Sequence, residues 1–138
     1  MTDRLPSKQL LSKANSILKN DHAVLVEDPK KAKAYANYLA ALGPSIRQLG
    51  LLPTLAIYCS EGGGGEVAKQ PLANYLQQVL VAIYSKEEPP MEGDLFEYAL
   101  SRRNNQDATR LFRRRLETTI RAAKLIFKTY DHGRTAEK

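Results

Sequence analysis

The sequence predicts an all-α protein, a single-domain bundle of about six helices that ends in a long basic helix. Three observations support this fold class. Apolar residues recur at helical spacing through most of the chain. No stretch shows the sustained alternation of apolar and polar residues that is typical of half-buried strands. Proline, glycine and Asx residues separate the apolar stripes where helices begin and end.

The length and composition set limits on the kind of protein. At 138 residues, the chain is long enough for one domain, residues 1–138, that buries roughly two-thirds of the surface of its unfolded state. A single cysteine, Cys59, cannot form an internal disulfide and suits a reducing compartment. No apolar stretch approaches the roughly 20 residues of a membrane span, and the first residues do not open a secretory signal. We therefore expect a soluble, cytoplasmic protein without a membrane partner.

The first two predicted helices each have a clear start. An apolar stripe within residues 2–21 follows Ser7, which is a suitable N-cap, and residues 22–27 form a short continuation or a loop. Asp28 followed by Pro29 then marks the start of the second helix. Its core stripe consists of Ala36, Leu39, Leu42, Ile46 and Leu49.

The stretch 35–58 organises the rest of the chain as a helical hairpin. Gly43 and Pro44 are expected to bend or interrupt its first helix, because proline lacks a backbone donor and its ring clashes with the preceding turn. Gly50 is expected to end that helix. Pro53 fits the first turn of the next helix, which the apolar run 55–58 packs into the core.

Four consecutive glycines at 62–65 could suggest a phosphate-binding loop. Such a loop requires a preceding strand and a Gly-Lys-Ser/Thr start to the following helix, and neither is present. A flexible loop over about residues 60–67 is the better interpretation.

Three helices complete the bundle. Residues 71–84 carry one apolar face, and the prolines at 89 and 90 end that region. Residues 93–103 form a short helix with Asp94 near its start. The last helix is capped by Asp107 or Asn105 and runs to about Tyr130, where Asp131-His132-Gly133 stops it and leaves a disordered tail at about 132–138.

Positive charge is concentrated in this last segment. The whole chain carries +6, but residues 102–128 alone hold nine basic and two acidic residues, which leaves −1 for the remainder. At ~100° per residue the basic side chains of the last helix gather opposite its apolar stripe. They are Arg110, Arg113, Arg114, Arg121, Lys124 and Lys128. Arg47, Lys30 and Lys33 form a second basic group on the hairpin.

This stripe extends over ~27 Å and predicts contact with the backbone of single-stranded RNA. Most aromatic residues lie at core spacing, so a base-stacking platform is not expected. A solvated helix face is the competing interpretation of the charge alone.

A catalytic centre is not predicted. The two histidines, His22 and His132, have no partners at metal-ligand spacing, and Cys59 has no cysteine companion. The carboxylates are scattered or cluster in the proline-rich loop. We therefore expect no enzyme activity, no metal and no cofactor.

The stretch LGPSIRQLGLLPTLAIY at residues 42–58 resembles the signature of the small all-helical subunit of the Cmr (type III-B) CRISPR RNA-guided effector complex. The matching positions are Pro44, Ile46, Gly50, Leu51, Thr54, Leu55, Ala56 and Tyr58. Pro53 departs from the small residue expected before Thr54, and the glycine run at 62–65 is not part of the pattern.

The resemblance implies a non-catalytic subunit in antiviral defence. Its partners would be CRISPR guide RNA and target RNA, other subunits of the Cmr complex and copies of itself stacked along that complex. The small subunit of the related Csm (type III-A) complex is a close alternative, although the Gly50-Leu51 turn favours Cmr. A helical adaptor for an acidic protein, without a nucleic-acid role, is an alternative of a different class.

Overall fold

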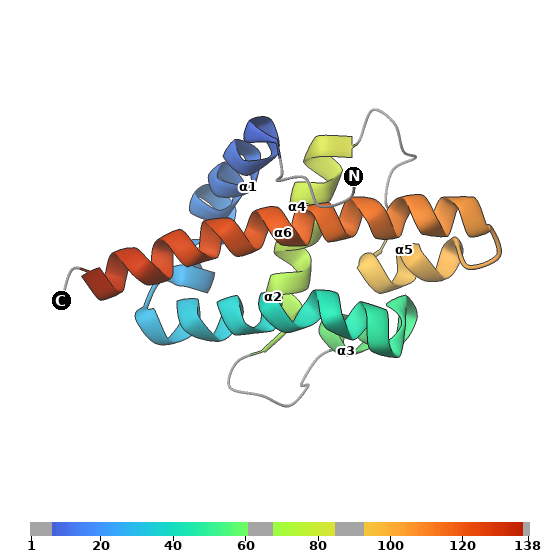
Figure 1. Cartoon of the computed structure of the whole chain (residues 1–138), viewed down its shortest axis with the longest axis horizontal. Coiled ribbons are helices and arrows are strands. Elements are labelled where there is room, and N and C mark those ends of the chain that lie inside the picture. Colours follow the sequence, from blue (N-terminus) through green and yellow to red (C-terminus); the bar gives the residue numbers. More distant parts are fainter. Residues whose placement is uncertain (1–6, 61–67, 85–92, 137–138) are drawn as a thin grey trace.

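A long C-terminal helix forms the axis around which the other helices pack (Figure 1). The computed structural model describes residues 7–60, 68–84 and 93–136, with only the backbone described for 131–136. These residues form six α-helices and one short 3-10 helix: α1 (Lys8–Asp21), η1 (Ala23–Val26), α2 (Pro29–Leu49), α3 (Leu51–Cys59), α4 (Gln70–Tyr84), α5 (Leu95–Ser101) and α6 (Gln106–Ala136). No strand occurs in these ranges, and the predicted all-α fold is confirmed.

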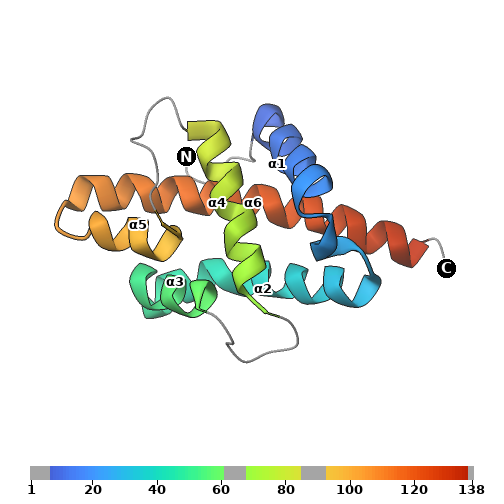
Figure 2. The ribbon, with the colours of Figure 1, turned by 180° about the vertical axis from the view of Figure 1, so that it is seen from behind.

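The helices are arranged on two sides of α6. Helix α2 lies alongside it and runs in the opposite direction, so the start of α2 is near the end of α6 (Figure 1). Helices α1 and α4 also pack against α6, and α4 crosses it on the far side of the molecule (Figure 2). Helices α3 and α5 contact each other near the N-terminal end of α6. One side of α6 is therefore left free of helices.

The predicted helix starts are confirmed by side-chain caps. Ser7 and Asp28 each accept a hydrogen bond from the backbone N–H three residues ahead, at 3.1 and 2.8 Å. Asp94 caps α5 in a reciprocal capping box with Glu97. Of the two residues predicted for α6, Asn105 is the cap, because its Oδ1 accepts from the N–H of Ala108 at 3.0 Å.

The predicted hairpin between α2 and α3 is present. Gly50 ends α2 at a φ of 103°, a backbone conformation that favours glycine, and its N–H donates to the carbonyl of Ile46 at 3.0 Å. Pro53 lies in the first turn of α3, where a missing N–H leaves no helical hydrogen bond unmade. The hydroxyl of Tyr58 donates to the carbonyl of Tyr38 at 3.0 Å and joins the two helices.

The expected interruption at Gly43-Pro44 is wrong, because α2 continues through both residues to Leu49. Leu42 and Ile46 are buried on either side of the proline and hold both turns against the core. Ala40, whose carbonyl loses its helical donor to Pro44, is exposed. Water reaches this part of the helix, so one missing bond does not break it.

The predicted end of the last helix at Tyr130 is also wrong. Helix α6 continues through Asp131-His132-Gly133 and ends at Ala136. A single glycine inside a helix costs only about 1 kcal/mol relative to alanine, and no proline follows it here. The predicted tail is therefore helical up to residue 136, and 137–138 lie outside the described residues.

One hydrophobic core joins all of these elements. Tyr75 of α4 is fully buried there, and its hydroxyl donates to the carbonyl of Ala14 at 2.9 Å. Three residues predicted to point into the core are instead exposed: Leu49 at 58%, Ile57 at 45%, and Ala56. Leu49 is the last residue of α2. Ala56 and Ile57 lie on the outer side of α3, which buries the residues before and after them. The flexible loop predicted for about 60–67 falls almost wholly outside the described residues, which exclude 61–67.

Candidate nucleic-acid interface

The outer side of α6 carries the six predicted basic residues, which we call the basic face: Arg110, Arg113, Arg114, Arg121, Lys124 and Lys128. Burial of Phe112, Leu116, Ile120 and Phe127 in the core fixes the rotation of α6 and turns this side outward. Arg110, Arg114 and Lys128 are exposed, whereas Arg113, Arg121 and Lys124 are half-buried. The basic face extends ~27 Å along the helix.

Most charges of the basic face have no counter-charge among the side chains that the structure describes. Arg110 lies 3.7 Å from Asp107, but both side chains are strongly exposed and such pairs contribute little. Arg113 pairs with Glu117 at 3.4 Å. Within the described residues, no carboxylate lies within ion-pair distance of Arg114, Arg121, Lys124 or Lys128. These four cations produce a positive potential that attracts an external anion.

A groove between α2 and α6 joins the two predicted basic groups. It has a volume of about 180 Å³. Its lining comes from Leu39, Gly43, Pro44 and Arg47 of α2 and from Glu117, Ile120, Arg121 and Lys124 of α6. Arg47, which the sequence placed in a second group, thus shares a surface with Arg121 and Lys124. We call this feature the α2–α6 groove.

Lys30 and Lys33 lie outside this groove, at the start of α2. Both are exposed, and the antiparallel arrangement places their turn toward the C-terminal end of α6, which carries Lys128 (Figure 1).

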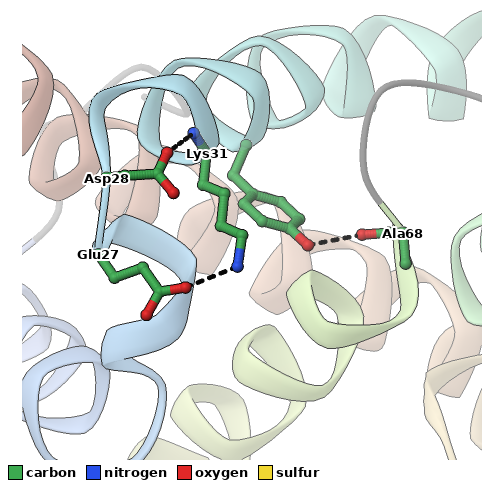
Figure 3. Close-up of polar contacts among 5 residues, drawn as sticks. Glu27, Asp28, Lys31 and Ala68 are labelled. Carbon is green, nitrogen blue, oxygen red and sulfur yellow. Dashed lines mark hydrogen bonds and ion pairs between the residues drawn. The ribbon is translucent and has the colours of Figure 1, made fainter.

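The start of α2 is fixed by polar contacts (Figure 3). Asp28 caps the backbone N–H of Lys31 at 2.8 Å, and the Lys31 ammonium donates to Glu27 at 2.7 Å (Figure 3). The hydrogen bond to Glu27 raises the pKa of Lys31. Tyr35 ties the next turn to the start of α4 by donating to the carbonyl of Ala68 at 2.8 Å. Lys31 is therefore engaged within the protein, unlike its neighbours Lys30 and Lys33, whose side chains extend from a fixed turn.

Sequence reasoning missed three members of the groove. Gly43 and Pro44, where the sequence predicts a bend or an interruption of the helix, line the groove, and the guanidinium of Arg47 lies near Gly43. Glu117 lies among the basic residues of the stripe and supplies the one carboxylate of the groove lining. The sequence signal for the groove was a glycine and a proline inside an otherwise helical pattern, because neither residue fills the space beside a neighbouring basic helix.

The aromatic residues do not form a surface on which bases could stack. None of the phenylalanine and tyrosine side chains in the described residues is exposed. Tyr84, which is half-buried, lies under the guanidinium of Arg115 at 4.7 Å. Arg115 thus packs against α4, away from the basic face. Any nucleic acid on this side would be held by its backbone.

The opposite side of the molecule differs strongly in charge. Helix α4, which faces the viewer in Figure 2, contains no charged residue along its 15 residues. A shallow hollow of about 660 Å³ between α1 and α4 has Asp21 as its one acidic lining residue. Helix α4 therefore adds no charge to its side of the molecule, in contrast to the row of cations on α6.

Groups capable of catalysis are few in this part of the chain. No three His, Cys, Asp or Glu side chains of the described residues are placed to hold a metal ion. His22 bonds Gln78 at 2.6 Å through Nε2. Burial raises the pKa of the Cys59 thiol to about 11, which makes it a poor nucleophile at neutral pH. None of the helices in the described ranges has the length and apolarity needed to cross a membrane.

Comparison with known families identifies the chain's relatives. A family model described as CRISPR-associated protein (Cas_Cmr5) matches residues 8–124, from the start of α1 to Lys124 on the basic face. No match is found among curated proteins or among solved structures. The matched range includes the α2–α3 hairpin that carries the resemblance and most of α6. The chain therefore belongs to the Cas_Cmr5 family of CRISPR-associated proteins, the small subunits of type III-B Cmr complexes.

Proposed function

We propose that this protein is a non-catalytic Cmr subunit that holds guide or target RNA by its phosphate backbone. The observation that carries the proposal is the basic face of α6, where four cations lack a carboxylate partner within the described residues. Arg47 adds a fifth cation from α2. A row of uncompensated cations over ~27 Å suits a chain of regularly spaced phosphates better than a small anion.

The proposed contact is independent of RNA sequence. Phosphate contacts fix the position of a nucleic acid and carry no base information. Stacking or edge contacts would supply that information, and the phenylalanine and tyrosine side chains of the described residues are buried or half-buried. Sequence recognition would then come from base pairing between the guide and its target, and this subunit would hold either strand.

Membership of the family supports the proposal that this subunit binds RNA as part of a larger complex. We place the chain among the other subunits of a cytoplasmic Cmr complex in antiviral defence, where several copies would extend one RNA track. Each copy offers a short track, so repetition along the complex would raise the overall affinity without new contacts. RNA binding by the isolated chain is expected to be weak for the same reason.

The first test measures binding of single-stranded RNA to the full chain over a range of salt concentrations. Backbone contact predicts that log affinity falls linearly with log salt, with a slope of about 0.7 per contacted phosphate. Arg114→Glu combined with Lys128→Glu is expected to reduce this slope by about 1.4 and the affinity at least tenfold, because both exposed contacts are lost.

The matched control is Lys8→Glu combined with Lys13→Glu. Both lysines are exposed on α1, and the change in net charge is the same. Equal loss of RNA binding in the two double variants would contradict the proposal, since total charge and not the basic face would then decide affinity. Undiminished retention of RNA by a Cmr complex assembled with the α6 variant would also contradict it. Capture of an acidic protein without RNA would favour the adaptor function.

A further inference from the structure

The α2–α6 groove contains a charge imbalance that the protein does not correct itself. Its lining holds three cations, Arg47, Arg121 and Lys124, against one carboxylate, Glu117. That carboxylate is already paired with Arg113, 3.4 Å away. Arg121 and Lys124 are half-buried, so water screens their mutual repulsion less than it would on an open surface. The groove is thus a site of net positive charge.

Arg121 is the least satisfied member of this site. Its Nε is closed to solvent and has no hydrogen-bond partner among the described residues. Its Nη2 reaches Thr118 Oγ1 only at 3.5 Å, the outer limit of a hydrogen bond. A buried donor on a charged group is costly to leave unpaired, and such groups in native proteins often mark the place of an ion. A small turn of this guanidinium toward the groove would present its fork of N–H donors to an oxyanion.

The size of the groove selects the kind of anion. About 180 Å³ corresponds to the space of roughly six water molecules in the liquid. Pockets for drug-sized ligands start at about 300 Å³, so the groove is smaller than such a pocket. One tetrahedral oxyanion with a few waters fits. Gly43 provides part of this space, because its missing side chain leaves α2 open beside the guanidinium of Arg47.

We infer that the α2–α6 groove is a seat for a single phosphodiester group, held by Arg47, Arg121 and Lys124. As a feature of the RNA track, this site rests on the proposed function. It divides the track into one enclosed contact from two helices and a series of open contacts at Arg110, Arg114 and Lys128. The enclosed contact fixes the register of the backbone, because its guanidinium forks bind phosphate oxygens in a defined geometry. The open contacts add long-range attraction.

The direct test titrates the full chain with dimethyl phosphate, which carries the single negative charge of an RNA linkage. The reporter is the Nε–Hε NMR signal of Arg121, assigned by its loss in Arg121→Lys. A saturable shift of this signal, absent from the Nε–Hε signal of exposed Arg114, is the expected result. Acetate at the same ionic strength is the control anion. No shift with dimethyl phosphate, or an equal shift with acetate, would overturn the assignment, the second outcome indicating an acidic side chain of a protein partner.

A steric variant tests the groove without changing its charge. Gly43→Leu places a side chain beside Arg47 and is compatible with a helix, since leucine is a better helix former than glycine. It is expected to abolish the shift caused by dimethyl phosphate while the thermal unfolding transition stays cooperative. Unchanged binding in a folded Gly43→Leu protein would show that the anion lies elsewhere.

An RNA experiment separates this inference from the proposed function. Arg121→Gln and Arg114→Gln remove the same charge from the same helix, one inside the groove and one outside it. The expected losses of RNA affinity are about tenfold for Arg121→Gln and about twofold for Arg114→Gln. Equal losses would overturn the enclosed site and leave the RNA function standing. If the groove bound dimethyl phosphate but the chain bound no RNA, the RNA function would be overturned and the anion site would stand.

Discussion

Two buried threonines in the described core differ in one hydrogen bond. The hydroxyl of Thr119 donates to the carbonyl of Arg115 at 2.9 Å, whereas the hydroxyl of Thr54 has no partner among the described residues. Valine has nearly the same shape and lacks the hydroxyl. Thr54→Val is therefore expected to raise the free energy of unfolding by about 1 kcal/mol more than Thr119→Val does. Urea unfolding of the two variants measures the difference.

The comparison between these threonines controls for helix propensity, because both lie inside helices and undergo the same substitution. Thr54→Ala adds a second control, since it removes the hydroxyl but also opens a cavity and should lower stability. If the two valine variants changed stability equally, the hydroxyl of Thr54 would be satisfied in solution.

At the level of single residues, sequence spacing predicts the side of a helix on which a side chain lies better than it predicts the groups that the side chain contacts. The rotation of α6 follows from its apolar stripe, so the side on which the basic residues lie could be predicted. The sequence could not predict which of these residues form ion pairs within the protein. Arg113 is paired with Glu117, and Arg121 has a buried donor, although both belong to the predicted stripe. These differences depend on rotamers and on the neighbouring helix.

Within α2, the proline at 44 is a local weakness. In a helix interior a proline costs about 3 kcal/mol, and it offsets up to about 1 kcal/mol of this by restricting the unfolded chain. Pro44→Ala is therefore expected to raise the free energy of unfolding by about 2 kcal/mol, because it restores the donor for the carbonyl of Ala40. Urea unfolding with an unchanged dependence on denaturant would measure this gain.

Ser45→Ala, at the next position of the same helix, serves as the control and should change stability by much less. A Pro44→Ala protein that is no more stable than the parent would contradict the expected gain. It would indicate that the helix bends at the proline and that the core has adapted to the bend.

The helix boundaries were predicted correctly wherever a capping residue within one turn determines them. Ser7, Asp28 and Gly50 act within one turn, and the structure confirms all three. Both errors arose from residues that weaken a helix without ending it, Pro44 in α2 and Gly133 in α6. At Pro44 the burial of Leu42 and Ile46 holds the helix, and this packing is not encoded in the nearest neighbours.

At the scale of the whole molecule, the arrangement of the helices creates the α2–α6 groove, which no single segment contains. Arg47 and Arg121 come from distant parts of the chain, and only the antiparallel packing of α2 on α6 brings them to one groove. The same packing turns the uncharged helix α4 to the opposite side. Sequence analysis could identify the basic segment and the family signature, but the groove depends on an inter-helix distance that periodicity does not give.

The stability of the whole bundle should decline at alkaline pH. Burial raises the pKa of the Cys59 thiol from 9.0 to about 11 and also raises the pKa values of the phenols of Tyr58 and Tyr75. Each group is neutral in the folded core and loses its proton more readily when the chain unfolds. The stabilising contribution is therefore complete below the unfolded pKa values, about 9 to 10, and is lost as the pH rises through them.

Urea unfolding between pH 7 and pH 11 tests this sign. The free energy of unfolding is expected to be nearly constant to about pH 9 and then to fall, by up to about 1.4 kcal/mol per pH unit for each group that titrates only in the unfolded chain. Tyr75→Phe removes the most deeply buried of these phenols and should make the decline shallower. The variant also loses the hydrogen bond from Tyr75 to the carbonyl of Ala14. The free energy of unfolding of the variant at pH 7 measures this loss, so it can be separated from the change in pH dependence. A decline of equal steepness in this variant would mean that Tyr75 reaches solvent before the bundle unfolds, so that α1 and α4 separate first.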